Sequence, residues 1–155
     1  MNNKIRKEVV LSKLKMLKNS LYYVKEFLPS DFKFLENRKD KNALYKETEF
    51  AIQLIIDICS VINSDISKEM PSDEDSIIDS LRRNKVLSDK ITKVLHEMIG
   101  FRNILVHKYG DIDDKKAYKE IKDGIKDFEL VIEEVEGFLM KLKKWTNRLG
   151  FFTEL

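Results

Sequence analysis

The stretch FRNILVHKY, residues 101–109, ends a long amphipathic segment and decides how the rest of the chain must fold around it. A helix turns by about 100° per residue, so the apolar positions of this segment share one stripe. The members of the stripe are Ile91, Val94, Leu95, Met98, Phe101 and Leu105. A polar stripe beside it consists of His96, Gly100, Asn103 and His107. Arg102 falls in the middle of the apolar stripe, so the pattern directs a permanent cation toward the protein interior.

Arg102 therefore needs a partner, because a buried guanidinium without one is too costly to persist. A carboxylate, a substrate phosphate or a second copy of the chain would each serve. Within the chain, Glu49, Gln53 and Asp57 follow one another at steps of four residues and form a polar line on an otherwise apolar segment. We expect Glu49 or Asp57, with equal weight, to pair with Arg102.

The composition is that of a compact helical protein. The 155 residues are 36% charged and 43% hydrophobic, with five glycines and two prolines, and we expect one domain over residues 1–155. The net charge of +2 excludes a general polycation, so any affinity for nucleic acid must be local. The single cysteine, Cys59, excludes an internal disulfide and fits a small core residue in a reducing cytoplasm.

No part of the sequence has the pattern of a signal peptide or a membrane span. Residues 1–18 are rich in lysine and lack a continuous apolar region. The longest apolar stretch, residues 51–62, is interrupted by Gln53, Asp57 and Ser60 and is too short to cross a bilayer. We expect a soluble cytoplasmic protein.

Apolar residues spaced three and four apart predict helices over about residues 3–28, 42–63, 76–83 and 89–108, and a long last helix that starts at Asp113 and Asp114. Ser88 is expected to cap the fourth helix and Gly110 to end it. The start of the second helix is ambiguous between Asp31 and Asn42, because the apolar residues there either begin the helix or plug a loop onto the core. Residues 64–75 are expected to form a solvated connection. The predicted fold is an antiparallel all-α bundle of four or five helices in up-and-down order.

The second helix is apolar almost all round. Ala51, Ile55 and Ile58 lie on one face, while Ile52 and Ile56 extend the apolar surface to another. Such a helix sits at the centre of a bundle or supplies an interface. We expect it to do both, with one face in the core and the other against a second subunit, which predicts a homodimer.

Several kinds of chemistry are unsupported by the sequence. His96 and His107 are eleven positions apart on a helix, or about 16 Å, which excludes a shared metal site within one chain. Gly100 and Gly110 stand alone, so there is no glycine-rich phosphate loop. Cys59 has no identifiable activating base. We expect no bound metal and no cofactor.

An arginine and a histidine acting on a phosphate remain. Arginine binds a phosphate through two hydrogen bonds and neutralises charge in the transition state. Histidine moves protons near neutral pH, as metal-independent RNA cleavage requires when the 2′-oxygen attacks its own phosphodiester. A twofold dimer would offer two copies of Arg102 and His107 around one cleft, and Asn103, one turn before His107, would orient it or bind the phosphate. A purely structural role for the Arg–His pair is the alternative.

The run Arg102-Asn103-Ile-Leu-Val-His107-Lys-Tyr109 resembles the R-x4-H-x-Y signature of the HepT-like group of HEPN domains. The resemblance extends from about Leu44 through the stretches AIQLIIDI, LRRNKVL and GFRNILVHKYGDID to Leu139, while the first predicted helix agrees only in pattern. It implies an all-α bundle that dimerises with the motif at the interface.

The resemblance also implies a function. Arg102 and His107 would be the ribonuclease residues, with Asn103 in support, and the chain would be a toxin paired with a minimal nucleotidyltransferase (MNT) antitoxin. That partner would silence the toxin by transferring AMP to Tyr109, which lies just past its predicted helix, where the phenol can be exposed. HEPN domains also serve as non-catalytic modules, so the second hypothesis is a companion subunit that holds a nucleotide or RNA beside a nucleotidyltransferase.

Overall fold

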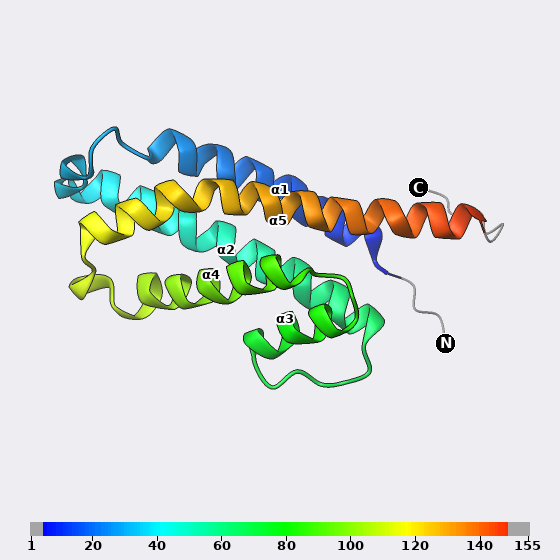
Figure 1. The fold of residues 1–155 in the computed structure, drawn as a ribbon. Coiled ribbons are helices and arrows are strands. Elements are labelled where there is room, and N and C mark those ends of the chain that lie inside the picture. The colour runs from blue at the N-terminus through cyan, green and yellow to red at the C-terminus, as the bar shows by residue number, and fades with distance from the viewer. Residues whose placement is uncertain (1–4, 149–155) are drawn as a thin grey trace.

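Four long helices lie alongside one another in alternating directions, and a short fifth helix lies against two of them (Figure 1). The computed structural model describes residues 5–148, without the side chains of Tyr109 and of residues 144–148. The helices are α1 (Lys7–Phe27), α2 (Arg38–Ile66), α3 (Glu74–Arg83), α4 (Asp89–His107) and α5 (Asp114–Arg148), with 3-10 turns η1 (Phe32–Glu36) and η2 (Tyr109–Asp111). No strand occurs among the described residues. The prediction of an antiparallel all-α bundle is confirmed.

The ambiguous segment before α2 resolves into the short turn η1 and an early helix start. Leu35 in η1 is fully buried, whereas Phe34 beside it is 59% exposed, so this turn plugs the core with one side chain. Asn37 then caps α2, because its side-chain oxygen accepts hydrogen bonds from the backbone N–H groups of Lys39 and Asp40 at 3.0 and 3.2 Å. Helix α2 therefore begins at Arg38, four residues before the predicted start.

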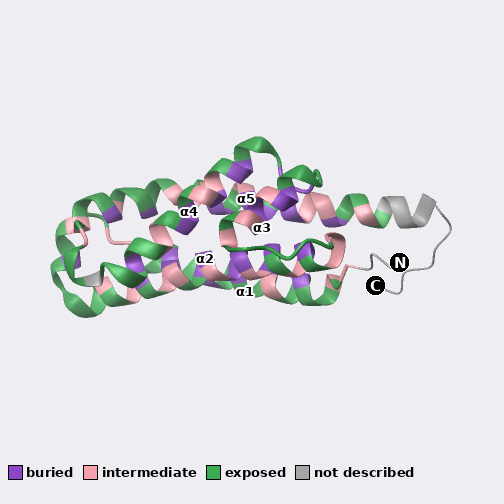
Figure 2. Cartoon of the chain, turned by 90° about the horizontal axis from the view of Figure 1, so that it is seen from below, coloured by how far each residue is buried: buried purple, intermediate pink, exposed green. Residues whose placement is uncertain are grey.

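Helix α2 occupies the centre of the bundle, with α1 against one side and α3 and α4 against another. Its buried apolar side chains spread over slightly more than half of the helix circumference, at about 100° per residue, and include Ala51, Ile52, Leu54, Ile55, Ile56, Ile58, Cys59 and Ile62. Figure 2 shows that buried residues line the sides on which the helices face one another. The second apolar face of α2 is thus covered within one chain. Our expectation that it lies against a second subunit is wrong, and it supplies no argument for a dimer.

Two other helix boundaries differ from the expectation for reasons of capping. The Asp73 side chain accepts from the backbone N–H of Ser76 at 2.7 Å, and the Ser76 hydroxyl accepts in return from the backbone N–H of Asp73 at 3.0 Å. This capping box begins α3 at Glu74, inside the predicted loop. The second boundary is the C-terminal end of α4, where the predicted glycine cap is wrong. Gly110 lies within η2, and the N–H of Asp111 in this turn donates to the Lys108 carbonyl at 2.8 Å.

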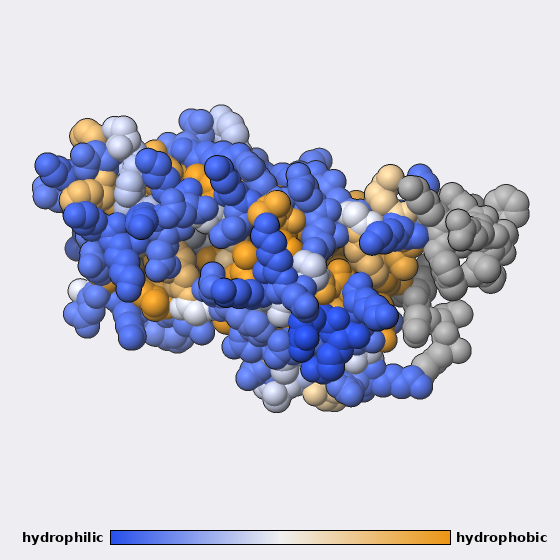
Figure 3. All heavy atoms as spheres, in the orientation of Figure 1, coloured by the Kyte–Doolittle hydropathy of each residue, from blue (hydrophilic) through white to orange (hydrophobic). Residues whose placement is uncertain are grey.

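The face seen in Figure 3 is largely hydrophilic, with apolar residues in smaller separate areas. Within residues 5–148, none of the helices combines the length and the apolar character that a bilayer crossing requires.

Candidate functional site

Arg102 joins three helices through its guanidinium group. From the penultimate turn of α4, Nη2 donates to both carboxylate oxygens of Glu74 on α3, at 2.8 and 2.7 Å. Nη1 donates to Oε1 of Gln53 on α2 at 2.6 Å. The Arg102 side chain is only 13% exposed, and its Nε is buried without a hydrogen-bond partner. The sequence argument that this cation points inward and needs a partner is confirmed, and the charged partner in this structure is a carboxylate.

The predicted partners of Arg102 are wrong. Glu49 accepts a hydrogen bond from Lys46 at 3.1 Å instead. Asp57 accepts one from Gln53 at 3.0 Å and lies 3.9 Å from the ammonium nitrogen of Lys13. The polar line on α2 does reach Arg102, but through Gln53, the neutral residue between the two acids.

The sequence reasoning missed Glu74 because it assigned residues 64–75 to a solvated connection. Helix α3 in fact begins at this residue, which brings its carboxylate against α4. One signal in the sequence pointed to a helix start at this position, since Asp73 and Ser76 have the three-residue spacing of a capping box.

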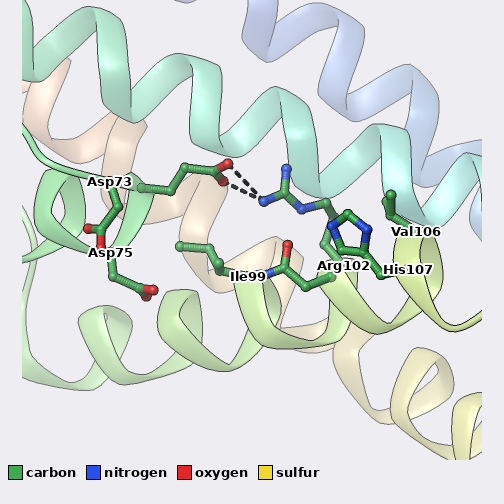
Figure 4. A pocket seen from close by; sticks show the side chains of 8 residues that line it. Asp73, Asp75, Ile99, Arg102, Val106 and His107 are labelled. Carbon is green, nitrogen blue, oxygen red and sulfur yellow. Dashed lines mark hydrogen bonds and ion pairs between the residues drawn. The ribbon is translucent and has the colours of Figure 1, made fainter.

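An open pocket of about 340 Å³ lies between α3 and α4. It is lined by Asp73, Glu74, Asp75, Ile99, Arg102, Asn103, Val106 and His107. Figure 4 shows Asp73, the N-cap of α3, and Asp75 in its first turn on the side opposite Arg102, Val106 and His107 of α4. The structure therefore brings together three of the four predicted site residues, and Asn103 and His107 are both exposed to solvent there. The backbone of Tyr109 follows in η2, and its side chain lies outside the described part of the chain.

The turn that carries Tyr109 is fixed at both ends. Before it, the Lys108 N–H still bonds to the Ile104 carbonyl of α4 at 3.0 Å. After it, Asp114 at the start of α5 accepts a hydrogen bond from the Tyr45 hydroxyl of α2 at 2.5 Å. The same carboxylate forms an ion pair with Lys41 of α2 at 3.4 Å. A second open pocket of about 410 Å³ adjoins this region and shares Val106 with the first. This second pocket is lined by residues of α2 and α4, and Val106 stands between it and the first.

His96 forms a second link between α4 and α3. Its Nδ1 lies 2.5 Å from Oδ1 of Asp75, and its Nε2 lies 2.8 Å from Oδ1 of Asp79. Ionised carboxylates only accept hydrogen bonds, so the ring satisfies both when both nitrogens carry protons. Burial of the ring lowers the pKa of His96, but the hydrogen bonds to the two aspartates and their negative charges outweigh it, so the pKa is raised above its ordinary value. The sequence pointed to neither aspartate.

Two further groups bear on the chemistry of the chain. Burial raises the pKa of the Cys59 thiol to about 12, so this group stays protonated and unreactive. Across residues 5–148, no three His, Cys, Asp or Glu side chains are arranged to hold a metal ion.

The comparison with known families decides which group of proteins this chain falls in. The family model "Ribonuclease HepT-like" matches residues 17–135, a range that includes the pocket and the motif from Arg102 to Tyr109. The chain belongs to the ribonuclease HepT-like family. The resemblance inferred from the sequence is therefore confirmed.

Two curated members of the HepT group are similar in sequence. The tRNA nuclease HepT of Aphanizomenon flos-aquae is 26% identical over 102 residues, which cover 63% of this chain and 69% of the relative. The mRNA nuclease HepT of Shewanella oneidensis is 19% identical over 130 residues, which cover 84% of this chain and 98% of the relative.

A solved HepT-like structure has the same fold. It is the tri-AMPylated HEPN toxin of Shewanella oneidensis in complex with an MNT antitoxin, and it matches with a TM-score of 0.76 at 19% identity. The match covers 83% of this chain and 97% of the toxin. A likeness of this kind supports the helical architecture rather than the roles of single side chains.

The His96 contacts predict a pH-dependent stability. Because its pKa is raised in the folded state, the stabilisation is fully present below the unfolded pKa of about 6.5 and is lost as the pH rises through the folded value. The difference in unfolding free energy between wild type and His96→Gln should therefore be large near pH 6 and should shrink at higher pH, as measured by urea denaturation.

The double variant Asp75→Asn/Asp79→Asn is the matched control, since it removes the two acceptors and keeps the histidine. It should show no such pH-dependent contribution from His96. A difference between wild type and His96→Gln that stays constant over this pH range would contradict the assignment.

Proposed function

We propose that this chain is a metal-independent ribonuclease toxin of a HEPN/MNT toxin–antitoxin pair, with Arg102 and His107 as catalytic residues and Asn103 in support. The observation that carries the proposal is that these three side chains line one open pocket. Membership of the ribonuclease HepT-like family and the nuclease names of two relatives support it. We propose further that residues 1–155 act as one domain in the cytoplasm.

The proposed reaction needs only groups that this chain carries. The 2′-oxygen of a ribose attacks the adjacent phosphorus, and the bond from phosphorus to the 5′-oxygen breaks. One proton leaves the 2′-hydroxyl and one reaches the departing 5′-oxygen, which gives a 2′,3′-cyclic phosphate and a 5′-hydroxyl. His107 transfers one of these protons, Arg102 neutralises the charge on the phosphate, and Asn103 orients His107 or binds a phosphate oxygen.

The nuclease should degrade RNA in the presence of a chelator. His107→Ala should lower the cleavage rate by about 10² to 10⁴, because it removes a proton-transferring group. The melting temperature should change little, because His107 is exposed. Lys108→Ala is the control, since it changes the adjacent exposed residue. Cleavage by His107→Ala at the wild-type rate would exclude this catalytic assignment.

We propose that the active form is a homodimer. One chain places one histidine in the pocket, whereas separate acid and base groups assist both proton transfers. Val106 and Ile104 on α4 are 43% and 40% exposed, and Val106 lines both pockets. An isologous contact there would bring two copies of Arg102 and His107 near a twofold axis.

Light scattering at micromolar concentration should give twice the mass of the chain. Val106→Glu should produce monomers by placing a charge in the contact, whereas Met140→Glu, on an apolar residue of α5 that is 58% exposed, should leave the mass unchanged. A monomeric wild-type protein would rule out the dimer.

The proposed partner is a minimal nucleotidyltransferase that transfers AMP from ATP to the Tyr109 oxygen with release of pyrophosphate. The solved toxin of Shewanella oneidensis is described as AMPylated and bound to an MNT antitoxin, which supports this regulation. The added phosphate would place negative charge close to His107 along the chain and compete with the RNA backbone for Arg102 and His107. Inhibition would then be both electrostatic and steric.

Intact-mass measurement after incubation with the partner and ATP should show added adenylate on wild type. Tyr109→Phe should show none, whereas Tyr22→Phe, which alters a tyrosine that is 56% exposed on α1, should be modified like wild type. Equal modification of Tyr109→Phe and wild type would place the acceptor elsewhere.

A non-catalytic role is the alternative, and the contacts of Arg102 favour it. Both Nη atoms of Arg102 are already bound by Glu74 and Gln53, as in a structural ion pair. In that case the chain would hold a nucleotide or RNA beside a nucleotidyltransferase and would bind RNA without cleaving it.

A further inference from the structure

Glu74 occupies the part of Arg102 that a phosphate would bind. Carboxylates and phosphates make the same charge-assisted hydrogen bonds to a guanidinium group. Nη2 donates to both oxygens of Glu74, and Nη1 is held by Gln53. With the Arg102 side chain 13% exposed, little of the guanidinium is left for a ligand in this state.

The two partners of Arg102 differ in how firmly they are held. The Glu74 side chain is 38% exposed and borders the open pocket, so its carboxylate can be hydrated if it leaves Arg102. Gln53 is fixed in addition by its own hydrogen bond to Asp57 at 3.0 Å. A neutral amide also orients the guanidinium without cancelling its charge. Gln53 therefore suits a permanent positioning role, and Glu74 suits an exchangeable one.

Helix α3 can keep its place while Glu74 moves. Asp75 and Asp79 bind His96 on α4 at 2.5 and 2.8 Å. Ile77, Ile78 and Leu81 are buried in the core, and the capping box of Asp73 and Ser76 holds the start of the helix. None of these contacts involves the Glu74 side chain, so rotation of that side chain alone would free Nη2.

We propose that Glu74 is an internal competitor for RNA phosphate at Arg102, so that the free chain is autoinhibited until a phosphate displaces the carboxylate. The inference rests on the proposed function in one respect, namely that Arg102 binds RNA phosphate. The exchange conserves charge pairing, because the guanidinium passes from one anion to another while Gln53 remains bound. In the absence of RNA, the Glu74 carboxylate keeps the largely buried Arg102 guanidinium from being left unpaired.

A non-cleavable RNA measures this competition without catalysis. The probe is a single-stranded oligonucleotide with 2′-O-methyl groups, which lack the attacking hydroxyl, and its binding is followed by fluorescence anisotropy. Glu74→Gln keeps the size of the side chain and removes the charge, so it should bind the probe about tenfold more tightly than wild type. Glu69→Gln is the control, because it removes the charge of a glutamate five positions earlier in the chain that pairs with Arg83 and not with Arg102, and it should bind like wild type.

A double-variant comparison tests whether the effect passes through Arg102. In an Arg102→Ala background, Glu74→Gln should give no gain in affinity. Glu74→Asp keeps the charge but shortens the reach, and a gain in this variant supports the competition if Glu74→Gln does not fold. Melting temperatures identify the folded variants.

The outcomes separate the two proposals. Tighter binding by Glu74→Gln with faster RNA cleavage supports both. Tighter binding without cleavage by any variant supports the competition and contradicts the ribonuclease. Binding no tighter than that of Glu69→Gln, by a chain that does cleave RNA, overturns the competition alone. A gain that persists in the Arg102→Ala background also overturns it.

Discussion

The ion pair between Arg102 and Glu74 is the interaction on which the arrangement of the site depends. The Arg102 side chain is only 13% exposed, and a largely buried guanidinium is too costly to leave unpaired, so the fold must bring a carboxylate to it. The capping box at Asp73 meets this requirement by starting α3 one residue later, at Glu74. This pair borders the pocket between α3 and α4, while the His96 contacts and the buried side chains of α3 hold the short helix against the long one.

The same pair is compatible with both a structural role of Arg102 and its proposed role in binding phosphate. Breaking a fully buried ion pair destabilises a protein by about 3–5 kcal/mol, because the remaining charge stays buried. Glu74 is 38% exposed, so water can hydrate its carboxylate, and the loss in Arg102→Ala should fall well below that range. A moderate loss of stability is therefore compatible with phosphate binding, and only a large one would contradict a catalytic role.

The sequence was sufficient where local rules decide the structure. Periodicity predicted the all-α bundle, the inward direction of Arg102 and the shared face of Asn103 and His107. The sequence did not predict pairings between distant segments. Arg102 and Glu74 are 28 positions apart, and their contact depends on where α3 begins. The second apolar face of α2 was assigned to a dimer contact for a related reason. An apolar pattern does not tell whether that face packs against another helix of the same chain or against a second chain.

The products of RNA cleavage test the central claim most directly, because the chemistry of the new ends reports the reaction that Arg102 and His107 are proposed to perform. End-group analysis after cleavage in chelator should find 2′,3′-cyclic phosphates and 5′-hydroxyls. A substrate with a deoxyribose at the cut site should resist cleavage there. Products with 5′-phosphates and 3′-hydroxyls, or cleavage that stops when divalent metal is removed, would contradict the account.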